Sequence, residues 1–257
     1  MYPIIKIFGT EISAYALMAI LGLLVAGFIF CRRIAEERPE DTDAVFLLFT
    51  IAFGMYAGGH VLFFITQAKH WHLLAEAENA EKFKEIFSSL AGGSVFYGGL
   101  IAAFLLGVLY LKIRKVPNTV YMDSAALFAP LFHGFARIGC FLSGCCYGVE
   151  CGFGLPMHGT VRFPVQLLES LCNFIIAAVI YAVLKKGLLR GKVFYLYLAI
   201  YAFVRFFDEF LRGDALRGFV FGLSTSQFIS IFIEAFALAM LLLPIIKKKY
   251  TKKKTSV

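Results

Sequence analysis

Charged residues are scarce in this sequence. Only 16% of its 257 residues are Asp, Glu, Lys or Arg, whereas 60% are hydrophobic. A soluble domain needs a largely polar surface around its core, so this composition excludes the soluble globular class and favours an integral membrane protein. The sequence also has no internal repeat and no linker rich in proline or serine. We therefore expect a single transmembrane helical domain over residues 1–246, followed by a basic cytoplasmic tail over residues 247–257.

Long apolar stretches recur along the chain, separated by short charged clusters. A hydrocarbon core of about 30 Å requires roughly 20 residues for each helical crossing. The first stretch lacks a basic leader and a clean cleavage site, so we interpret it as a retained anchor and not as a signal peptide. The pattern predicts an all-α polytopic membrane protein with seven transmembrane helices, near residues 12–31, 43–66, 92–111, 119–145, 165–184, 193–211 and 225–246.

Basic residues are distributed unequally between the two sides of such a bundle. With seven spans, sixteen lysines and arginines fall on one side and seven on the other. Basic residues in short loops accumulate on the cytoplasmic face, which predicts the amino terminus outside and the carboxyl terminus inside a bacterial inner membrane. The lysine-rich tail accounts for the net charge of +8 as a topogenic signal that contacts anionic lipids. No nucleic-acid partner is expected.

One sizeable polar segment interrupts the apolar pattern, residues 69–90 after the second span. Its apolar residues recur at roughly helical spacing among charges, which indicates an amphipathic helix on the outer surface. A solvated connector is the alternative, because the pattern is short.

Two arginines, Arg137 and Arg205, fall inside predicted spans. An arginine at bilayer depth costs on the order of 3 kcal/mol unless it faces a cavity or a partner. Counted along the helices from Thr119 and Lys192, both side chains lie in the outer half of the bilayer and can converge on one site. This cost argues against a plain scaffold protein.

Arg205 shares one helical face with polar residues, namely Tyr201, Glu209 and Arg212. An ion pair between Arg205 and Glu209 that only neutralises charge is the structural alternative. Arg137 lies one turn from His133 and from Cys140, and no carboxylate lies within a turn of it. A guanidinium without a carboxylate is suited to bind the phosphate of a lipid headgroup.

Paired glycines flank Tyr97 in the segment 92–104. Such pairs permit a broken backbone or the close approach of a ligand, although glycine also serves helix packing in membranes.

Four of the six cysteines, Cys140, Cys145, Cys146 and Cys151, fall within twelve residues at the outer end of one span. A disulfide or a reactive thiolate beside Arg137 is one interpretation. Their spacing is not a standard zinc pattern, so no metal site is expected. Cys31 and Cys172 are interpreted as small apolar fillers.

Six short motifs occur in an order that resembles the phosphatidylglycerol:prolipoprotein diacylglyceryl transferase family. They are Tyr15 in ISAYALM, YGGLI at 97–101, ARIGCFLSGCCYG at 136–148, RFPVQLLES at 162–170, YAFVRFFDEFLR at 201–212 and LSTSQFIS at 223–230. The resemblance covers about Tyr15 to Glu234, nearly the whole chain.

The resemblance implies transfer of a diacylglyceryl group from phosphatidylglycerol to the lipobox cysteine of a prolipoprotein, without a cofactor. The expected partners are the phospholipid, the signal peptide of the lipoprotein precursor and the bilayer. Such chemistry needs cations for the phosphate and a base for the thiol. The implied catalytic residues are Arg137, Arg205, Glu209, Tyr97 and His133; the implied substrate-binding residues are Tyr15, Gly98, Gly99, Cys140, Cys145, Arg162, Gln166, Tyr201 and Arg212.

The sequence departs from the family pattern where proton carriers are expected. Tyr97 stands in place of the family's histidine, and Ala136, Cys140 and Cys145 stand in place of Gly, Asn and Glu. A divergent transferase is one reading of these changes. A paralogue whose clustered cysteines carry thiol redox or soft-metal chemistry is the other.

Overall fold

The computed structural model describes residues 3–7, 9–214 and 218–254, and the chain in these ranges is mostly helical. Two short 3-10 turns occur at Ala68–His70 and Glu209–Leu211. The helices are α1 Ala14–Glu37, α2 Asp43–Thr66, α3 His72–Ala75, α4 Ala80–Ala91, α5 Phe96–Arg114, α6 Asn118–Ser143, α7 Val165–Lys185, α8 Val193–Asp208 and α9 Thr225–Lys254. Three antiparallel hairpins pair β1 Ile4–Ile7 with β2 Thr10–Ser13, β3 Glu150–Met157 with β4 Thr160–Arg162, and β5 Phe219–Val220 with β6 Leu223–Ser224.

Six of these helices are long and apolar enough to cross a membrane. They are α1, α2, most of α5, α6, α7 and the part of α9 up to Leu243. The seventh expected span corresponds to α8, which has only 16 residues before the 3-10 turn begins. At about 1.5 Å per residue, a helix of this length falls short of the hydrocarbon thickness. The fold is therefore an all-α polytopic membrane protein.

The polar segment after α2 forms a shorter helix than expected. Its first part is broken into the 3-10 turn and α3, and only α4 extends over three turns. Asn79 ends the break, because its side chain accepts a hydrogen bond from the Lys82 backbone N–H at 2.8 Å and so caps α4. Phe83 and Phe87 stack on one face of α4 with ring centroids 6.3 Å apart. The expected amphipathic helix thus occupies the second half of the segment.

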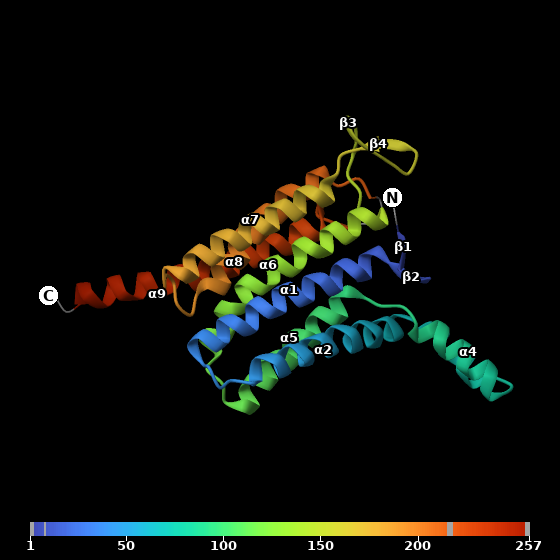
Figure 1. Cartoon of the computed structure of the whole chain (residues 1–257), viewed down its shortest axis with the longest axis horizontal. Helices are drawn as coiled ribbons and strands as arrows, with labels where there is room; N and C mark the ends of the chain where they lie inside the picture. The colour runs from blue at the N-terminus through green and yellow to red at the C-terminus, as the bar shows by residue number, and fades with distance from the viewer. Residues whose placement is uncertain (1–2, 8, 215–217, 255–257) are drawn as a thin grey trace. The chain divides into compact units, whose positions relative to one another are not determined.

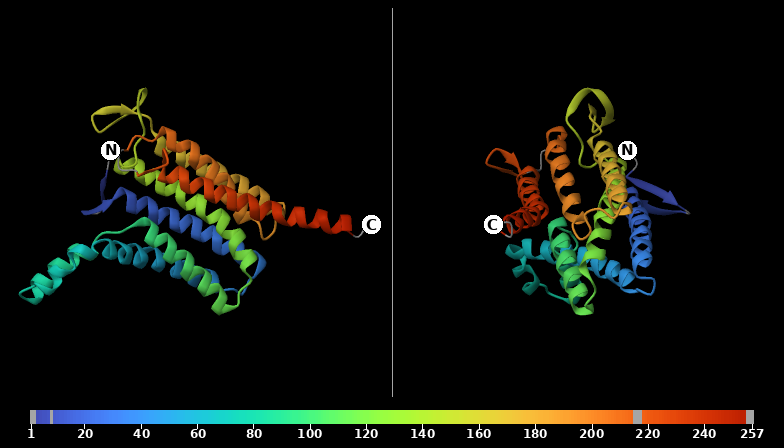
Figure 2. Two further views of the ribbon diagram at one scale, coloured as in Figure 1. Left: turned by 180° about the vertical axis from the view of Figure 1, so that it is seen from behind. Right: turned by 90° about the vertical axis from the view of Figure 1, so that its left-hand side faces the viewer.

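The chain forms two compact units, one of residues up to Glu37 and from Thr119 onward, the other Arg38–Asn118. In the first unit, α6, α7 and α8 share a buried core (Figure 1). Gly22 brings α1 against α6, since a Cβ there would lie 2.8 Å from the Cβ of Phe135. Hairpins β1–β2 and β3–β4 lie at the same end of this unit (Figure 2). The core residues are Ala126, Leu127, Ile176, Ala177, Ile180, Leu184, Val193 and Tyr197.

The second unit is built on close packing of α2 against α5. A Cβ added to Gly98 would lie 2.5 Å from the carbonyl oxygen of Gly58, and one added to Gly99 would lie 2.4 Å from that of Met55. Only glycine allows the two backbones to approach this closely. The α5 helix is continuous from Phe96, so the paired glycines serve helix packing and do not break the backbone.

Replacing Gly99 by Ala is expected to destabilise the protein by about 1–3 kcal/mol, because the added methyl group must displace the backbone of α2. Gly107 on the same helix is the matched control, since its Cβ would meet Ile51 at an ordinary 3.5 Å. Thermal unfolding of both variants in detergent tests this difference. Equal melting temperatures for Gly99→Ala and Gly107→Ala would contradict the packing argument.

Candidate functional site

The centre of the polar cluster is Glu169 on α7, whose side chain is only 2% exposed. Its Oε2 lies 2.5 Å from the Nε of Arg137 on α6, and its Oε1 lies 3.6 Å from the Nη1 of Arg205 on α8. The Nη1 of Arg212, just beyond α8, lies 4.0 Å from the same Oε1. The two arginines expected to converge therefore meet at one carboxylate, and a third guanidinium lies beside them.

The expectation that Arg137 has no carboxylate partner is wrong. No acidic residue lies within one turn of it on α6, but α7 packs beside α6 and supplies Glu169. The ion pair forms because a buried guanidinium is stable only beside an opposite charge or a hydrogen-bond acceptor. Only the Nε of Arg137 takes part in an ion pair in the described chain. The two terminal amino groups remain as donors for an anionic ligand.

Arg205 is held by three groups from three elements. Its Nη2 lies 2.7 Å from the Oε2 of Glu209, so the expected pair within the α8 segment is present. The same Nη2 also donates to the Oγ of Ser226 on α9 at 3.1 Å. Together with the contact to Glu169, these bonds show that Arg205 connects α7, α8 and α9. An ion pair that only neutralises itself does not describe this arrangement.

A capping box fixes the start of α9, where Ser226 lies. The backbone N–H of Gln227 donates to the Ser224 Oγ at 3.2 Å, and the Ser224 backbone N–H donates to the Gln227 Oε1 at 3.1 Å. This reciprocal pair satisfies two donors at the helix start. The motif LSTSQFIS thus positions a hydroxyl that contacts Arg205.

Tyr201 and His133 lie together on the inner faces of α8 and α6, with ring centroids 5.4 Å apart. Tyr15 lies in the first turn of α1 and packs against Gly139, where an added Cβ would lie 3.1 Å from the Cα of Tyr15. These three residues belong to the same unit as the arginine cluster.

The other expected binding residues lie between α6 and α7, at the start of α7 and just beyond α8. Arg162 pairs with Glu150 at 2.7 Å and lies 4.5 Å above the centroid of the Tyr147 ring, so it holds the β3–β4 hairpin together. Gln166 is fully buried, and its Nε2 donates to the Cys145 carbonyl oxygen at 2.7 Å. Arg212 is paired with Asp214 at 2.7 Å in addition to its approach to Glu169. Arg162 and Gln166 make structural contacts that the sequence did not indicate.

Tyr97, Gly98 and Gly99 lie in the first turn of α5, in the second unit. Tyr97 is 46% exposed, whereas the two glycines are buried against α2. The part assigned to these residues in substrate binding or catalysis stays a prediction.

All six cysteines are free thiols. Cys140 ends the helical face that carries Arg137, and Cys145 and Cys146 follow in the next turn of chain. Hydrogen bonds with the thiols of Cys140 and Cys145 lower the pKa of the Cys146 thiol below its ordinary value, and the charges of Arg212 and Arg137 act in the same direction. The Cys146 thiol therefore lies in the electrostatic field of Arg137 and Arg212.

Sequence reasoning missed Glu169 and Ser226 as members of the site. Both stand inside motifs that the resemblance singled out, RFPVQLLES and LSTSQFIS. Both could have been found from the sequence, because Glu169 and Ser226 are polar residues within apolar spans. Polar groups without a partner are costly there.

The arrangement is suited to bind an anion and to stabilise charge that develops on it. Three guanidinium groups surround a buried carboxylate, and cations held in this way can stabilise negative charge on a ligand. His133 lies on α6 one turn before Arg137, so a side chain that can accept a proton adjoins the cluster.

Comparisons with known proteins agree on one family. The family model described as prolipoprotein diacylglyceryl transferase matches residues 3–243. The chain is 35% identical over 242 residues to phosphatidylglycerol–prolipoprotein diacylglyceryl transferase 2 of Clostridium perfringens strain 13, covering 89% of each chain. It is 33% identical to phosphatidylglycerol–prolipoprotein diacylglyceryl transferase of Clostridium tetani, covering 90% of this chain and 93% of the relative. It is 32% identical to the enzyme of Geobacter sulfurreducens over 82% of both chains.

Proposed function

The chain belongs to the prolipoprotein diacylglyceryl transferase family, and from this membership we propose that the arginine cluster around Glu169 is its catalytic centre. The protein is a membrane transferase that moves the diacylglyceryl group of phosphatidylglycerol to the thiol of a prolipoprotein cysteine. In this reaction a carbon–sulfur bond forms while the bond from the same carbon to a phosphate oxygen breaks. The electron pair leaves with glycerol phosphate, and the thiol proton passes to a base.

The observation that carries the proposal is the ion pair between the Nε of Arg137 and Glu169. It fixes the guanidinium plane from one edge and leaves the two terminal nitrogens to donate to the phosphate of the lipid. Arg205, oriented by Glu209 and Ser226, supplies a second positive charge where negative charge develops on the leaving group. Tyr15, Tyr201 and Arg212 complete the headgroup site.

A proton acceptor is needed for the cysteine thiol. His133 serves as this base in our proposal, because an imidazole nitrogen can accept a proton and the residue lies one turn from Arg137 on α6. Tyr97 takes the place of the family's histidine, and we propose its part in catalysis from that position in the motif. In this proposal one side of the substrate site is formed by residues in and beside the segment between α6 and α7, namely Arg162, Gln166, Cys140 and Cys145.

We further propose that the chain crosses a bacterial inner membrane seven times, with α8 and the following 3-10 turn as the short sixth crossing. The amino terminus lies outside and the basic tail lies in the cytoplasm, because sixteen basic residues fall on one side and seven on the other. The site then opens to the outer side, where the signal peptide of a lipoprotein precursor presents its cysteine.

Cysteine labelling tests this topology. A membrane-impermeant maleimide is expected to label Glu78→Cys in intact cells, but to label Lys115→Cys and Leu188→Cys only after permeabilisation. Mass spectrometry assigns the label to each position and separates it from the native thiols. External labelling at residue 115 or 188 would overturn the proposed orientation.

Two variants test whether the arginines or the cysteines carry the reaction. The Arg137→Gln variant is expected to lose transfer to a lipobox peptide, whereas Cys140→Ser/Cys145→Ser retains much of its turnover. Loss confined to the double serine variant would assign the chemistry to the thiols.

A further inference from the structure

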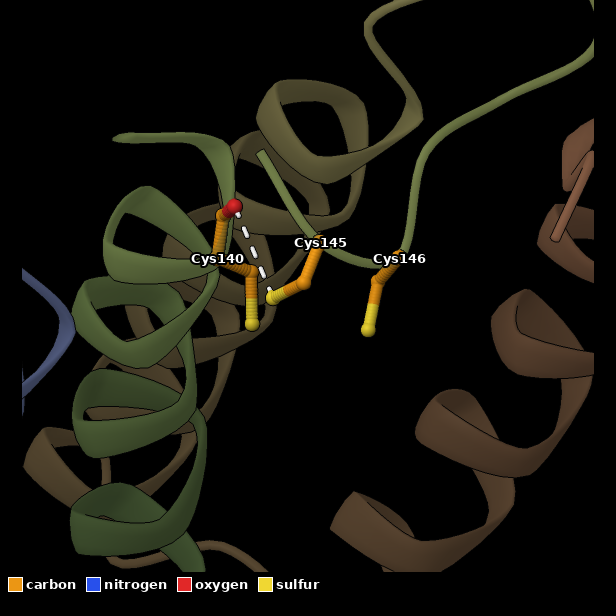
Figure 3. Close-up of side chains that lie close together, drawn as sticks. All are labelled: Cys140, Cys145 and Cys146. Atoms are coloured by element: carbon orange, nitrogen blue, oxygen red, sulfur yellow. Dashed lines mark hydrogen bonds between the residues drawn. The ribbon is translucent and has the colours of Figure 1, made fainter. Parts of the chain in front are cut away.

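Three thiols gather where α6 ends. The Sγ atoms of Cys140, Cys145 and Cys146 all lie within 4.8 Å of one another. Figure 3 shows the three side chains pointing into the same space from the last turn of α6 and the chain that follows it. This grouping is not evident from the sequence spacing, which resembles no standard metal motif.

The turn after α6 accounts for the grouping. The Cys145 backbone N–H donates to the Cys140 carbonyl oxygen, and the Gly144 N–H donates to the Phe141 carbonyl oxygen, both at 3.1 Å. Gly144 has a φ of +73°. These features define a Schellman motif. In this motif the residue that follows the left-handed glycine packs its side chain against the last turn of the helix. Here both of the residues that meet in this way are cysteines, Cys140 and Cys145.

Cys146 completes the set through its own backbone conformation. Its φ of +55° is uncommon for a residue with a side chain. Because Cys145 and Cys146 follow each other directly, an extended backbone would point their side chains in opposite directions. The left-handed conformation instead turns the Cys146 thiol towards the other two, as Figure 3 shows.

Neighbouring elements hold this turn in place. Gln166 of α7 donates to the Cys145 carbonyl oxygen at 2.7 Å. The Nε2 of His158, in the β3–β4 turn, lies 2.6 Å from the Gly144 carbonyl oxygen. The thiols therefore stand on a backbone that is fixed from two sides, as the ligands of a preorganised metal site are.

We propose that Cys140, Cys145 and Cys146 bind a soft, thiophilic metal ion, copper(I) foremost, with three sulfur ligands. Bonds of about 2.3 Å between sulfur and metal place the sulfur atoms about 4 Å apart, so a contraction of less than about 1 Å closes the site. A ligand set of thiolates alone selects soft ions. A set of three sulfurs is one ligand short of a structural zinc site, which requires four ligands.

The three thiols differ in their access to solvent. Cys145 is exposed and provides an entry path, while Cys140 is buried. Since Cys140 follows Arg137 by one helical turn, a bound ion would lie beside the transferase site.

Metal titration of the purified, reduced full-length protein in detergent tests the proposal, under anaerobic conditions and without lipid or acceptor. We expect one equivalent of copper(I) to bind in competition with a chromophoric copper(I) chelator. Cys140→Ser, Cys145→Ser and Cys146→Ser should each weaken binding at least tenfold. Cys151→Ser and Cys172→Ser are the matched controls and should bind as the native protein does.

A second measurement on the native chain does not depend on how the variants fold. Copper(I) is expected to protect Cys145 and Cys146 from maleimide labelling, as read by mass spectrometry, and to leave Cys151 reactive. Absent protection, tighter binding of zinc(II) than of copper(I), or affinity lost only in Cys151→Ser would overturn the proposal. Because these assays contain no lipid or acceptor, either result leaves the transferase assignment unaffected.

Discussion

Replacing Arg137 by Lys is expected to lower kcat/KM for diacylglyceryl transfer by about 100-fold, although the positive charge is kept. Lysine presents a single ammonium group, so it cannot pair with Glu169 through one edge and donate to a phosphate through two further nitrogens. Removing one preorganised donor to a charge that develops in the transition state costs about 100-fold or more in other enzymes. Transfer from phosphatidylglycerol to a lipobox peptide, measured at several lipid concentrations, gives this ratio.

The matched control for this change is Arg190→Lys. Arg190 also pairs with a glutamate, Glu37, but its side chain is 75% exposed. The adjoining Gly191 bonds to Asp123 near the start of α6, whereas Arg137 lies towards the end of that helix. We expect its turnover to stay within about twofold of the native value, since exposed ion pairs contribute little. Near-normal turnover of Arg137→Lys would show that Arg137 only balances the charge of Glu169.

Replacing Glu169 by Gln is expected to destabilise the fold by about 3–5 kcal/mol, the usual cost of removing one partner of a buried ion pair. The carboxylate is 2% exposed, and three guanidinium groups surround it. A neutral amide of the same size keeps the packing but leaves the arginines without their shared counter-charge. Thermal or denaturant unfolding of the purified protein in detergent measures the loss.

Glu150→Gln provides the comparison for Glu169→Gln. Glu150 also pairs with an arginine, Arg162, at 2.7 Å, but its side chain is 60% exposed. Its replacement should change the stability by no more than about 1 kcal/mol. If the two variants unfold alike, the buried carboxylate does not organise the arginine cluster as we describe.

The fold follows largely from composition and apolar periodicity. Length and hydropathy locate the helices, because lipid offers no partner for an unpaired backbone and only helices satisfy it within one segment. The prediction was less accurate where polar residues set the boundaries. Asn79 interrupts the polar segment after α2 by capping α4, and α8 ends early at Asp208, where the chain enters a 3-10 turn.

The depth of Arg137 and Arg205 pointed to a site, but their partners could not be derived from either helix alone. Helical periodicity shows which residues share a face, as it did for Arg205 and Glu209. It does not show which helices are neighbours, so Glu169 on α7 was not assigned to Arg137. That pairing depends on tertiary packing around the core of α6, α7 and α8.

The thiol cluster shows a different limit of sequence analysis. Metal motifs are read from spacing along regular elements, and residues 140, 145 and 146 match none of them. Their convergence results from a Schellman turn at Gly144 and from the left-handed backbone of Cys146. A glycine just beyond a helix predicts such a turn, but the direction of the following side chains depends on backbone angles that no pattern reveals.

The most direct test of the central claim is to incubate the purified protein with phosphatidylglycerol and a lipobox peptide, and to identify both products by mass spectrometry. We expect the peptide to gain one diacylglyceryl group on its cysteine as an equal amount of glycerol phosphate is released, and Arg137→Gln to form neither product at a comparable rate. A peptide that remains unmodified while the native protein is folded, or one modified equally well by Arg137→Gln, would contradict the assignment of catalysis to the arginine cluster.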